Sequence, residues 1–318
     1  MARTSFQTKG NEDRMLQAAE LLRRGGVVAF PTETVYGLGA NALDPAAIAR
    51  IYEIKGRPRT SPLIVHVATI EKARELVTEW PETAERLARR FWPGPLTLVL
   101  PKHEVVPVEL TAGLGTVGIR IPAHPVALRL LELAGVPVAA PSANRFMQLS
   151  PTTAAHVEAA LGAAVDLILD GGATRVGIES TVLSLVGGVP LLLRPGMISR
   201  VQIEEVIGPV EVAGAMEGAH PSPGMQDRHY SPRTPLYLVR GPADLAAAGR
   251  GVYLFLTRPA LGVTCVAMPA EAEAYAAQLY ETLHRYDDGS WDWIAVEQPS
   301  EEPAWAGVND RLRRARMQ

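Results

Sequence analysis

The chain of 318 residues contains a single cysteine, Cys265, which excludes an intrachain disulfide and fits a reducing compartment. No CxxC or HExxH motif occurs, so a zinc site of the usual spacing is not expected. The polar segment 1–14 lacks the apolar core of a signal peptide, and no apolar run reaches the roughly 18 residues that a membrane span needs. These absences predict a cytoplasmic protein with no membrane partner.

Lysine is also scarce, with four copies (Lys9, Lys55, Lys72 and Lys102) among 31 basic residues. The formal net charge is −3, which argues against a protein that coats nucleic acid through bulk positive charge. Common nucleotide signatures are missing as well. Gly-Lys never occurs, which excludes a P-loop, and the stretch from Gly37 lacks the third glycine of a dinucleotide fingerprint. A bound nucleotide would therefore need a different scheme.

The fold class predicted from the pattern is α/β, in two domains. Hydrophobic residues make up 47% of the chain, and its length suits two cores better than one. Helix and strand patterns alternate up to residue 207 with hairpin-like pieces among them, which predicts a twisted mixed sheet with packed helices. The stretch 208–234 is rich in Gly, Pro and Ala and is typical of a linker. Residues 235–318 predict a small Rossmann-like α/β domain.

Several element ends carry capping residues. Asp44 and Pro45 predict the start of a helix that Gly56 ends, and Ser199 with Gln202 predicts a capping box. A hairpin is expected around Gly187–Gly188. In the tail we expect strands over 236–240, 252–256 and 293–296, and helices near residue 244, over 270–286 and after 303.

The last helix ends in a cluster of arginines at positions 311, 313, 314 and 316. The helix macrodipole favours cations at this end, so the cluster indicates a solvated helix end, with an RNA contact as the alternative.

Polar residues lie next to buried strands at several points. The segment Phe30–Gly39 places two threonines, a carboxylate and a tyrosine directly after a strand, where ligands bind in open α/β sheets, although a tight loop without a ligand is the alternative. Lys55, Arg57 and Arg59 put three cations into a Gly/Pro loop. Such a loop indicates either an anion clamp or a solvated charged loop.

Further polar residues follow or interrupt other strands. Ser142 and Asn144 come directly after the expected strand Val136–Ala140 and indicate a nucleotide contact or a turn cap. Arg120 lies on an otherwise apolar strand, where a buried guanidinium needs a ligand carboxylate or an internal salt bridge. The segment 177–181 and Arg194 add weaker signals of the same kind.

Together these motifs resemble the YrdC-like domain of threonylcarbamoyl-AMP synthases over roughly residues 10–207. The family's paired KxR and SxN signature falls on Lys55, Arg57, Ser142 and Asn144. The matching segments, in the family's order, are FPTETVYGLG (30–39), KGRP (55–58), PLIVHV (62–67), WPGPLT (92–97), GTVGIRIP (115–122), APSAN (140–144), SPTT (150–153) and ESTV (179–182).

The remainder resembles the long form of this family, which adds a linker with a GM…HY..P element and a small C-terminal domain. The element falls on residues 224–232. The chain departs from the family at three positions, with Ser61 where asparagine is frequent, Met147 where glycine is common and Gln226 where lysine is common.

The resemblance implies a YrdC-like catalytic domain over 1–207, a linker over the active site at 208–234 and a small α/β domain over 235–318. It implies a reaction in which L-threonine, bicarbonate or CO2, and ATP give threonylcarbamoyl-AMP and pyrophosphate. Mg2+ would be held by the ATP phosphates, with no metal ligand from the protein. The product would pass to enzymes that transfer the threonylcarbamoyl group to tRNA, and no strong direct binding of nucleic acid is expected.

The resemblance also assigns site residues. Lys55, Arg57, Ser142 and Asn144 are expected to be catalytic. The residues expected around ATP are Arg57, Ser61, Thr116, Ser142, Ser150, Arg194 and Tyr230. Those expected around threonine are Thr34, His66, Arg120, Ser180 and the backbone of Ala140.

Two other functions compete with this one. An RNA-binding module without catalysis would use the same basic loop on a phosphate backbone. The negative net charge and the lack of aromatic stacking platforms near Lys55 weigh against it. A carbamoyl-transfer maturation factor also carries a YrdC-like domain, but its zinc-finger cysteines are absent from this chain.

Overall fold

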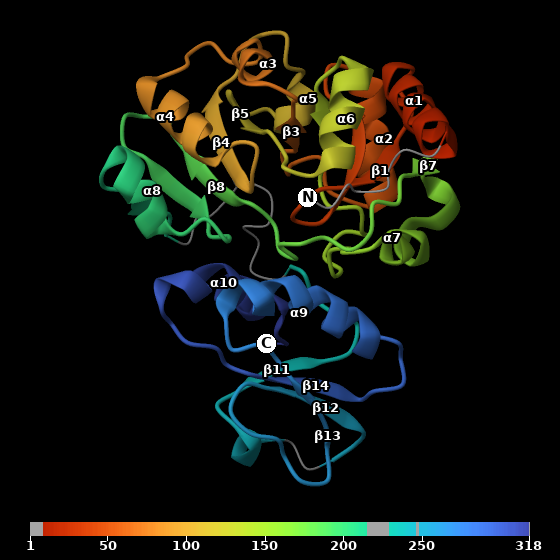
Figure 1. The fold of residues 1–318 in the computed structure, drawn as a ribbon, viewed down its shortest axis with the longest axis vertical. Helices are drawn as coiled ribbons and strands as arrows, with labels where there is room; N and C mark the ends of the chain where they lie inside the picture. The colour runs from red at the N-terminus through yellow and green to blue at the C-terminus, as the bar shows by residue number, and fades with distance from the viewer. Residues whose placement is uncertain (1–8, 215–228, 246–247, 318) are drawn as a thin grey trace.

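The computed structural model describes residues 9–214, 229–245 and 248–317. The strands of its larger sheet are β1 (Val28–Pro31), β2 (Tyr36–Asn41), β3 (Ile64–His66), β4 (Leu96–Pro101), β5 (Thr116–Arg120), β6 (Val138–Ala139), β7 (Leu167–Ile168), β8 (Thr181–Ser184), β9 (Leu191–Arg194) and β10 (Glu211–Val212). They lie in the order β10-β9-β8-β4-β5-β3-β6-β2-β1-β7, with parallel and antiparallel neighbours (Figure 1). The predicted mixed α/β sheet is therefore confirmed.

Helices surround this sheet. They are α1 (Lys9–Arg23), α2 (Pro45–Lys55), α3 (Ile70–Arg74), α4 (Glu82–Phe91), α5 (Val108–Thr111), α6 (Pro125–Ala134), α7 (Ala154–Leu161) and α8 (Arg200–Ile207). The predicted caps are confirmed. Asp44 accepts from the Ala46 amide at the start of α2, Gly56 ends that helix in the left-handed region, and α8 begins with the Ser199–Gln202 capping box.

The two faces of the larger sheet bury different helices. Because side chains alternate along a strand, Val65 and Ile64 of β3 point to opposite faces. Val65 belongs to the main apolar core with α2, α4 and α5, whereas Val138 and Phe30, on the other face, pack against α1 and α6. Next to that second packing, Ile64 joins a small apolar cluster with Val99, Val182 and Leu193 of neighbouring strands. This part of the second face carries the pocket described below.

The smaller sheet consists of β11 (Leu236–Val239), β12 (Gly251–Phe255), β13 (Thr264–Ala267) and β14 (Trp293–Glu297), in the order β11-β14-β12-β13. These neighbouring strands all pair in parallel. Two helices, α9 (Ala272–Tyr286) and α10 (Ala306–Ala315), lie between this sheet and the larger domain in Figure 1. A single apolar cluster joins Tyr275 and Leu279 of α9 to Ile178 and Leu149 of the larger domain.

Some local expectations were wrong. The segment 30–39, expected as a turn directly after a strand, contains a second strand that was not predicted, because Tyr36–Asn41 pairs antiparallel with β1. The helix expected near Asp244 is a 3-10 turn of three residues, Pro242–Asp244. Strand β13 was not predicted, and Glu211–Val212 in the expected linker pairs with β9. The residues 224–228 of the linker element lie outside the described residues.

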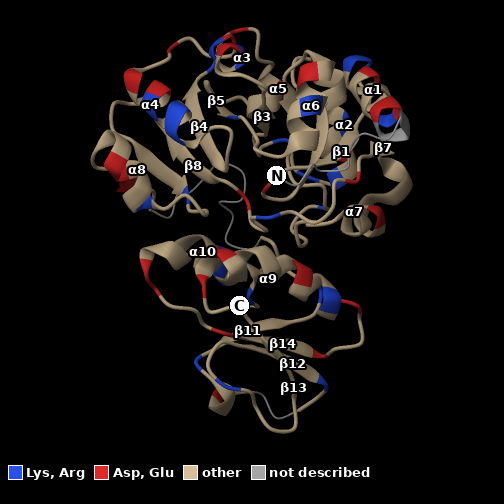
Figure 2. Cartoon of the chain, viewed as in Figure 1, with Lys and Arg blue, Asp and Glu red and all other residues tan. Residues whose placement is uncertain are grey.

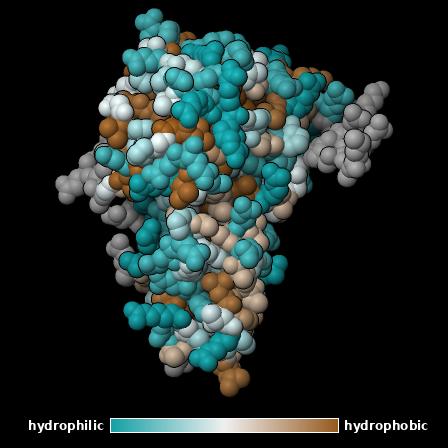
Figure 3. Space-filling view, turned by 60° about the vertical axis from the view of Figure 1, so that its left-hand side comes forward, coloured by the Kyte–Doolittle hydropathy of each residue, from teal (hydrophilic) through white to brown (hydrophobic). Residues whose placement is uncertain are grey.

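The surface is mixed in charge and mostly hydrophilic. Basic and acidic residues are interspersed along α1, α3, α4 and α9 (Figure 2), so none of these helices presents a stripe of one sign. On the face shown in Figure 3, hydrophobic side chains form small separate groups among hydrophilic ones. No helix in the described part of the chain is long and apolar enough to cross a membrane.

Candidate active site

A narrow, partly open pocket lies over the second face of the larger sheet. Its volume is about 50 Å³, room for a few water molecules but far too small for a nucleotide. The lining comes from residues far apart in sequence: Thr32, Thr34, Val35, Gly37, Arg57, Ile64, His66, Arg120, Ala140, Pro141, Ser142, Glu179, Ser180, Arg194, His229 and Tyr230. Ile64 and His66 of β3 line it together with residues that directly follow the antiparallel strand β6, so the pocket lies across the sheet and not at one edge of it.

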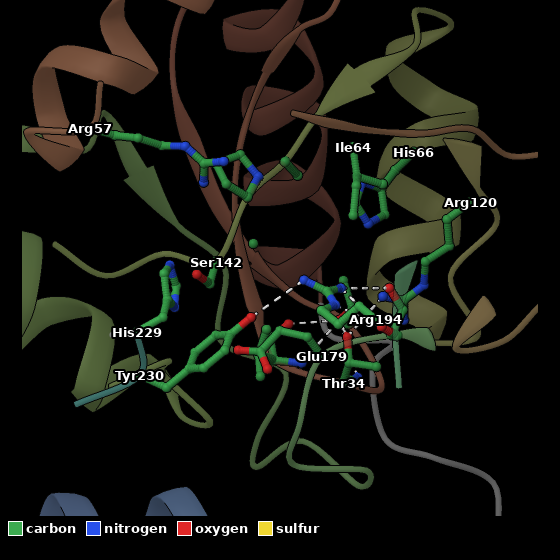
Figure 4. Close-up of a pocket in the computed structure, with 16 residues that line it drawn as sticks. Thr34, Arg57, Ile64, His66, Arg120, Ser142, Glu179, Arg194, His229 and Tyr230 are labelled. Atoms are coloured by element: carbon green, nitrogen blue, oxygen red, sulfur yellow. Dashed lines mark hydrogen bonds between the residues drawn. The ribbon is translucent and has the colours of Figure 1, made fainter. Parts of the chain in front are cut away.

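Nine of the expected site residues line this pocket. They are Thr34, Arg57, His66, Arg120, Ala140, Ser142, Ser180, Arg194 and Tyr230. In Figure 4, Arg57 and Ser142 lie on one side of the pocket, His66 and Arg120 lie on the other, and Arg194 lies between them. The residues expected to hold ATP and those expected to hold threonine therefore meet in one cavity.

The basic loop after α2 contributes one cation to the pocket, not three. Arg57 is 7% exposed, and its Nη2 donates to Ser61 Oγ at 2.5 Å and to the Pro62 carbonyl at 2.9 Å. Burial lowers its pKa to about 10, so it remains a cation at neutral pH. Arg59 is exposed and lies 3.8 Å from Glu53. Of the two alternatives left open for this loop, the anion clamp fits Arg57 and the solvated loop fits Arg59, while Lys55 is buried outside the pocket lining.

Lys55 lies outside the pocket lining. Its Nζ donates to the carbonyl oxygens of Ser142 and Asn144, each at 2.6 Å, and to Asn144 Oδ1 at 3.3 Å. Burial, together with the nearby Arg57, lowers the pKa of Lys55 well below its usual value. The ammonium therefore ties the end of α2 to the Ser142–Asn144 loop.

The opposite end of the pocket is built around Arg120, at the end of β5. Its Nη2 lies 2.6 Å from Glu33 Oε1, its Nη1 donates to Thr34 Oγ1 at 3.0 Å and its Nε donates to the Gly94 carbonyl at 3.1 Å. The internal salt bridge left open from the sequence is therefore present. Because one guanidinium holds both Glu33 and Thr34, the loop between β1 and β2 is fixed against β5.

Arg194, at the end of β9, connects the two ends of the pocket. Its Nη2 donates to the carbonyl and hydroxyl oxygens of Ser180, at 2.9 and 3.1 Å. Its Nη1 lies 3.5 Å from the hydroxyl of Tyr230, a contact marked in Figure 4. Burial lowers its pKa, as it does for Arg57. Ser180 in turn shares a hydrogen bond of 2.8 Å with Thr97 of β4.

Three buried nitrogen atoms of the pocket have neither a hydrogen-bond partner nor an ion-pair partner among the described residues: Arg57 Nε, His66 Nδ1 and His229 Nδ1. Buried polar atoms are nearly always paired, so such atoms in a pocket point to a ligand. Burial and the nearby Arg120 lower the pKa of His66 to about 3, so this imidazole is neutral at physiological pH.

The far wall comes from the end of the linker. His229 and Tyr230 pack ring against ring with centroids 4.0 Å apart, and Tyr230 is 1% exposed. Tyr230 has a backbone φ of 59°, in the left-handed region that costs a side chain about 1 kcal/mol or more. These two residues form part of the pocket lining.

Five expected site residues do not line the pocket. Lys55 and Asn144 form the tie described above, and Ser61 accepts from Arg57. Ser150 donates to Glu179 Oε1 at 2.5 Å, and Thr116 begins β5 opposite Pro101.

Four residues of this region were not among the expected site residues. Glu179, Glu33 and His229 are buried at or beside the pocket. Arg311 was expected at a solvated helix end, but this is wrong: it is 1% exposed and its Nε lies 2.6 Å from Glu179 Oε2. For the Arg311–Glu179 pair, the sequence offered one signal, which was an isolated glutamate, Glu179, just before strand β8.

Comparison with known proteins assigns a class to this fold and site. Residues 20–196 match the Sua5/YciO/YrdC family model, described as "Telomere recombination", and residues 198–316 match the model "Threonylcarbamoyl-AMP synthase, C-terminal domain". Together these matches span most of the chain, in the arrangement of the long form of the family.

Relatives of nearly the same length narrow the assignment. The chain is 44% identical to the threonylcarbamoyl-AMP synthase of Pyrococcus abyssi, over 94% of this chain and 92% of the relative. It is also 44% identical to that of Bacillus subtilis, over 96% and 93%. The solved structure of P. abyssi Sua5 complexed with L-threonine superposes with a TM-score of 0.87 at 44% identity, covering 95% of this chain and 93% of that one. The chain belongs to the threonylcarbamoyl-AMP synthase family.

Proposed function

We propose that this protein converts L-threonine, bicarbonate or CO2, and ATP into threonylcarbamoyl-AMP and pyrophosphate. The observation that carries the proposal is the pocket in which three buried arginines, Arg57, Arg120 and Arg194, surround one cavity with hydroxyl groups between them. Both reactants are anionic, so a site that joins them has to offset their repulsion and hold them in line. Family membership over the full chain supports the same reaction.

Threonine is proposed to bind at the Arg120 end. There Arg120, whose guanidinium also pairs with Glu33, would attract the α-carboxylate, and Thr34, Ser180 and the Ala140 backbone would orient the amine and hydroxyl groups. His66 is neutral, so it would serve as a hydrogen-bond partner and not as an acid.

ATP is proposed to bind at the Arg57 end. Arg57, Ser142, Arg194 and Tyr230 would contact the nucleotide directly. Lys55 and Asn144 would act through the loop that carries Ser142, Ser61 through Arg57, and Ser150 through Glu179, so these four are positioning residues. Thr116 has no such link, and its proposed contact with ATP rests on family resemblance alone.

The chemistry needs no protein nucleophile. The threonine amine and the carbon source first form a carbamate. A carbamate oxygen then attacks the α-phosphorus, the bond to the bridging oxygen breaks, and pyrophosphate leaves with the electron pair. Arg57 and Arg194 would offset the charge on the phosphates, and the narrow pocket would keep water from the labile carbamate. Cys265 packs in the small domain on the outer face of its sheet and takes no part.

Mg2+ is proposed to accompany ATP on its phosphates. The two carboxylates at the pocket, Glu33 and Glu179, are each within 2.6 Å of an arginine nitrogen, so neither is presented as a ligand for a hard cation. The ion would supply charge neutralisation at the leaving pyrophosphate.

Entry of ATP is proposed to require movement of His229 and Tyr230, because the cavity they line holds about 50 Å³. We therefore retain the division into a catalytic domain (1–207), a covering linker (208–234) and a C-terminal domain (235–318). We also propose a cytoplasmic location, where downstream enzymes would transfer the threonylcarbamoyl group to tRNA.

The test is pyrophosphate release from ATP by the purified full chain, with Mg2+ and bicarbonate. Release is expected to require L-threonine, and Arg57→Ala is expected to lower it by about a hundredfold or more, since a charged contact to the phosphates is lost. Release that is equal with and without any amino acid would contradict the proposal.

A further inference from the structure

A buried arginine of the small domain reaches the wall of the pocket. Arg311 of α10 donates from Nε to Glu179 Oε2 at 2.6 Å and from Nη2 to the Glu179 carbonyl at 3.2 Å. The two residues are 132 positions apart in the chain. Because Glu179 lines the pocket, this contact connects the small domain directly to the site.

The same guanidinium contacts two other segments around the pocket. Its Nη1 donates to the Pro195 carbonyl at 3.0 Å, next to Arg194. Its central carbon lies 5.1 Å from the ring centroid of Tyr230, a cation–π geometry. One side chain of α10 therefore touches the segments that carry Glu179, Arg194 and Tyr230.

Close packing of the two domains fixes this arrangement. A Cβ placed on Gly177 would lie 2.2 Å from the carbonyl oxygen of Ala276 in α9, and one on Gly307 of α10 would lie 2.8 Å from that of Gly196. Both helices thus approach the pocket loops where only glycine leaves room. Arg311 is held at a defined place by its own helix.

The charge of Glu179 creates a problem that Arg311 solves. Burial alone would raise the pKa of this carboxyl, but Arg311 first and Arg194 second lower it, so Glu179 is ionised. An ionised carboxylate in the wall of a pocket for anions would repel phosphates strongly at low dielectric. Its other described partners, Ser150 and Tyr280, are neutral hydroxyl groups.

We propose that Arg311 is a positioning residue of the ATP site, supplied by the C-terminal domain, which neutralises Glu179 so that the positive charge of Arg57 and Arg194 acts on the nucleotide. This inference rests on the proposed function. It gives the C-terminal domain an electrostatic role in nucleotide binding.

The test replaces Arg311 by methionine in the full chain and measures the Kd for α,β-methylene-ATP with Mg2+ by calorimetry. Arg313→Met is the matched control, because Arg313 is exposed on the same helix. Asp310, the other carboxylate that contacts Arg311, also pairs with Arg314 at 3.0 Å, so Glu179 is the carboxylate that is expected to lose its ion-pair partner in the variant. We expect Arg311→Met to raise Kd about tenfold or more and Arg313→Met less than about twofold.

A charge rescue separates this role from a merely structural one. Adding Glu179→Gln to Arg311→Met removes the unpaired carboxylate and is expected to return Kd to within about threefold of wild type. A double variant that binds as poorly as Arg311→Met would overturn the inference, as would an Arg311→Met protein that binds like wild type.

Two further outcomes remain decisive. If Arg311→Met does not fold by circular dichroism, the comparison moves to the Glu179→Gln background. There, loss of Arg311 is expected to change Kd by less than about threefold, and a tenfold change would contradict the proposal. Failure of the wild-type protein itself to bind the analogue would instead contradict the proposed function.

Discussion

Replacing Lys55 by methionine tests whether this lysine is a tie between two loops or a ligand for phosphate. Methionine keeps the length of the side chain and removes the ammonium. The ammonium donates to two carbonyl oxygens at 2.6 Å and to Asn144 Oδ1 at 3.3 Å, and Lys55 is 2% exposed. The variant therefore leaves buried acceptors of the Ser142–Asn144 loop without a charged donor.

The size of the effect follows from these contacts. Each charge-assisted hydrogen bond contributes about 1.5–3 kcal/mol, and each buried carbonyl left unpaired costs about 1–3 kcal/mol. Relief from burying an ammonium, whose pKa is already lowered well below its usual value, offsets part of this loss. We expect the free energy of unfolding to fall by about 3 kcal/mol, which corresponds to a Tm lower by roughly 6 °C.

The assay is urea and thermal denaturation of the wild type, Lys55→Met and Lys72→Met. Lys72 is 54% exposed on α3, where it pairs with Glu75, so its loss should change stability by less than about 0.5 kcal/mol. If Lys55→Met unfolds with the wild-type midpoint but loses ATP turnover, Lys55 is a direct phosphate ligand and the tie described above is wrong.

Three other changes have expected outcomes. Arg120→Lys cannot reproduce the fork that holds Glu33 and Thr34, so KM for L-threonine should rise about tenfold while KM for ATP changes less than about twofold in steady-state kinetics. His284, stacked on His156 at 3.8 Å, has a pKa lowered to about 4, chiefly by burial. The unfolded chain therefore binds protons first, and stability should fall as pH drops from about 6.5 to 4, on the order of 3 kcal/mol for this group. Met147→Gly should stabilise the protein by up to about 1 kcal/mol, because Met147 has a φ of 68°.

Each of these outcomes has a contrary result. Equal increases in the two KM values for Arg120→Lys would show that the arginine shapes the whole pocket. A His284→Gln variant with the same acid slope as wild type, followed by Tm from pH 7 to 4, would remove the stacked histidines as its cause. A lower urea midpoint for Met147→Gly would show that the side chain contributes more than its backbone strain costs.

Local features of the fold were predictable because their causes are local. The caps at Asp44 and Ser199 and the hairpin at Gly187–Gly188 depend on neighbours within a few residues. The positions of Thr34 and Ser142 just after strands could be predicted from the apolar runs that precede them in the sequence. Strand β13 escaped prediction because its four residues, Thr264–Ala267, are short and partly exposed on an edge of the small sheet.

The sequence motifs identified many of the residues at the site, but they did not predict which side chains contact one another there. Nothing near Lys55 in the sequence indicates that its ammonium faces the backbone of residues 142–144, 87 positions away. Arg311 stands in a basic helix end, where the macrodipole argument is sound for its exposed neighbour Arg313. Arg311 is instead buried, because α10 packs against the segment that carries Glu179. This contact depends on the packing of two domains, which the sequence near Arg311 does not indicate.

The most direct test of the central claim is the identity of the product. The protein is incubated with ATP, Mg2+, L-threonine and 13C-labelled bicarbonate, and the mixture is analysed at once by mass spectrometry. We expect an AMP adduct of threonine that carries one labelled carbon, formed together with pyrophosphate. Formation of ADP, or of an unlabelled threonine–AMP adduct, would contradict it.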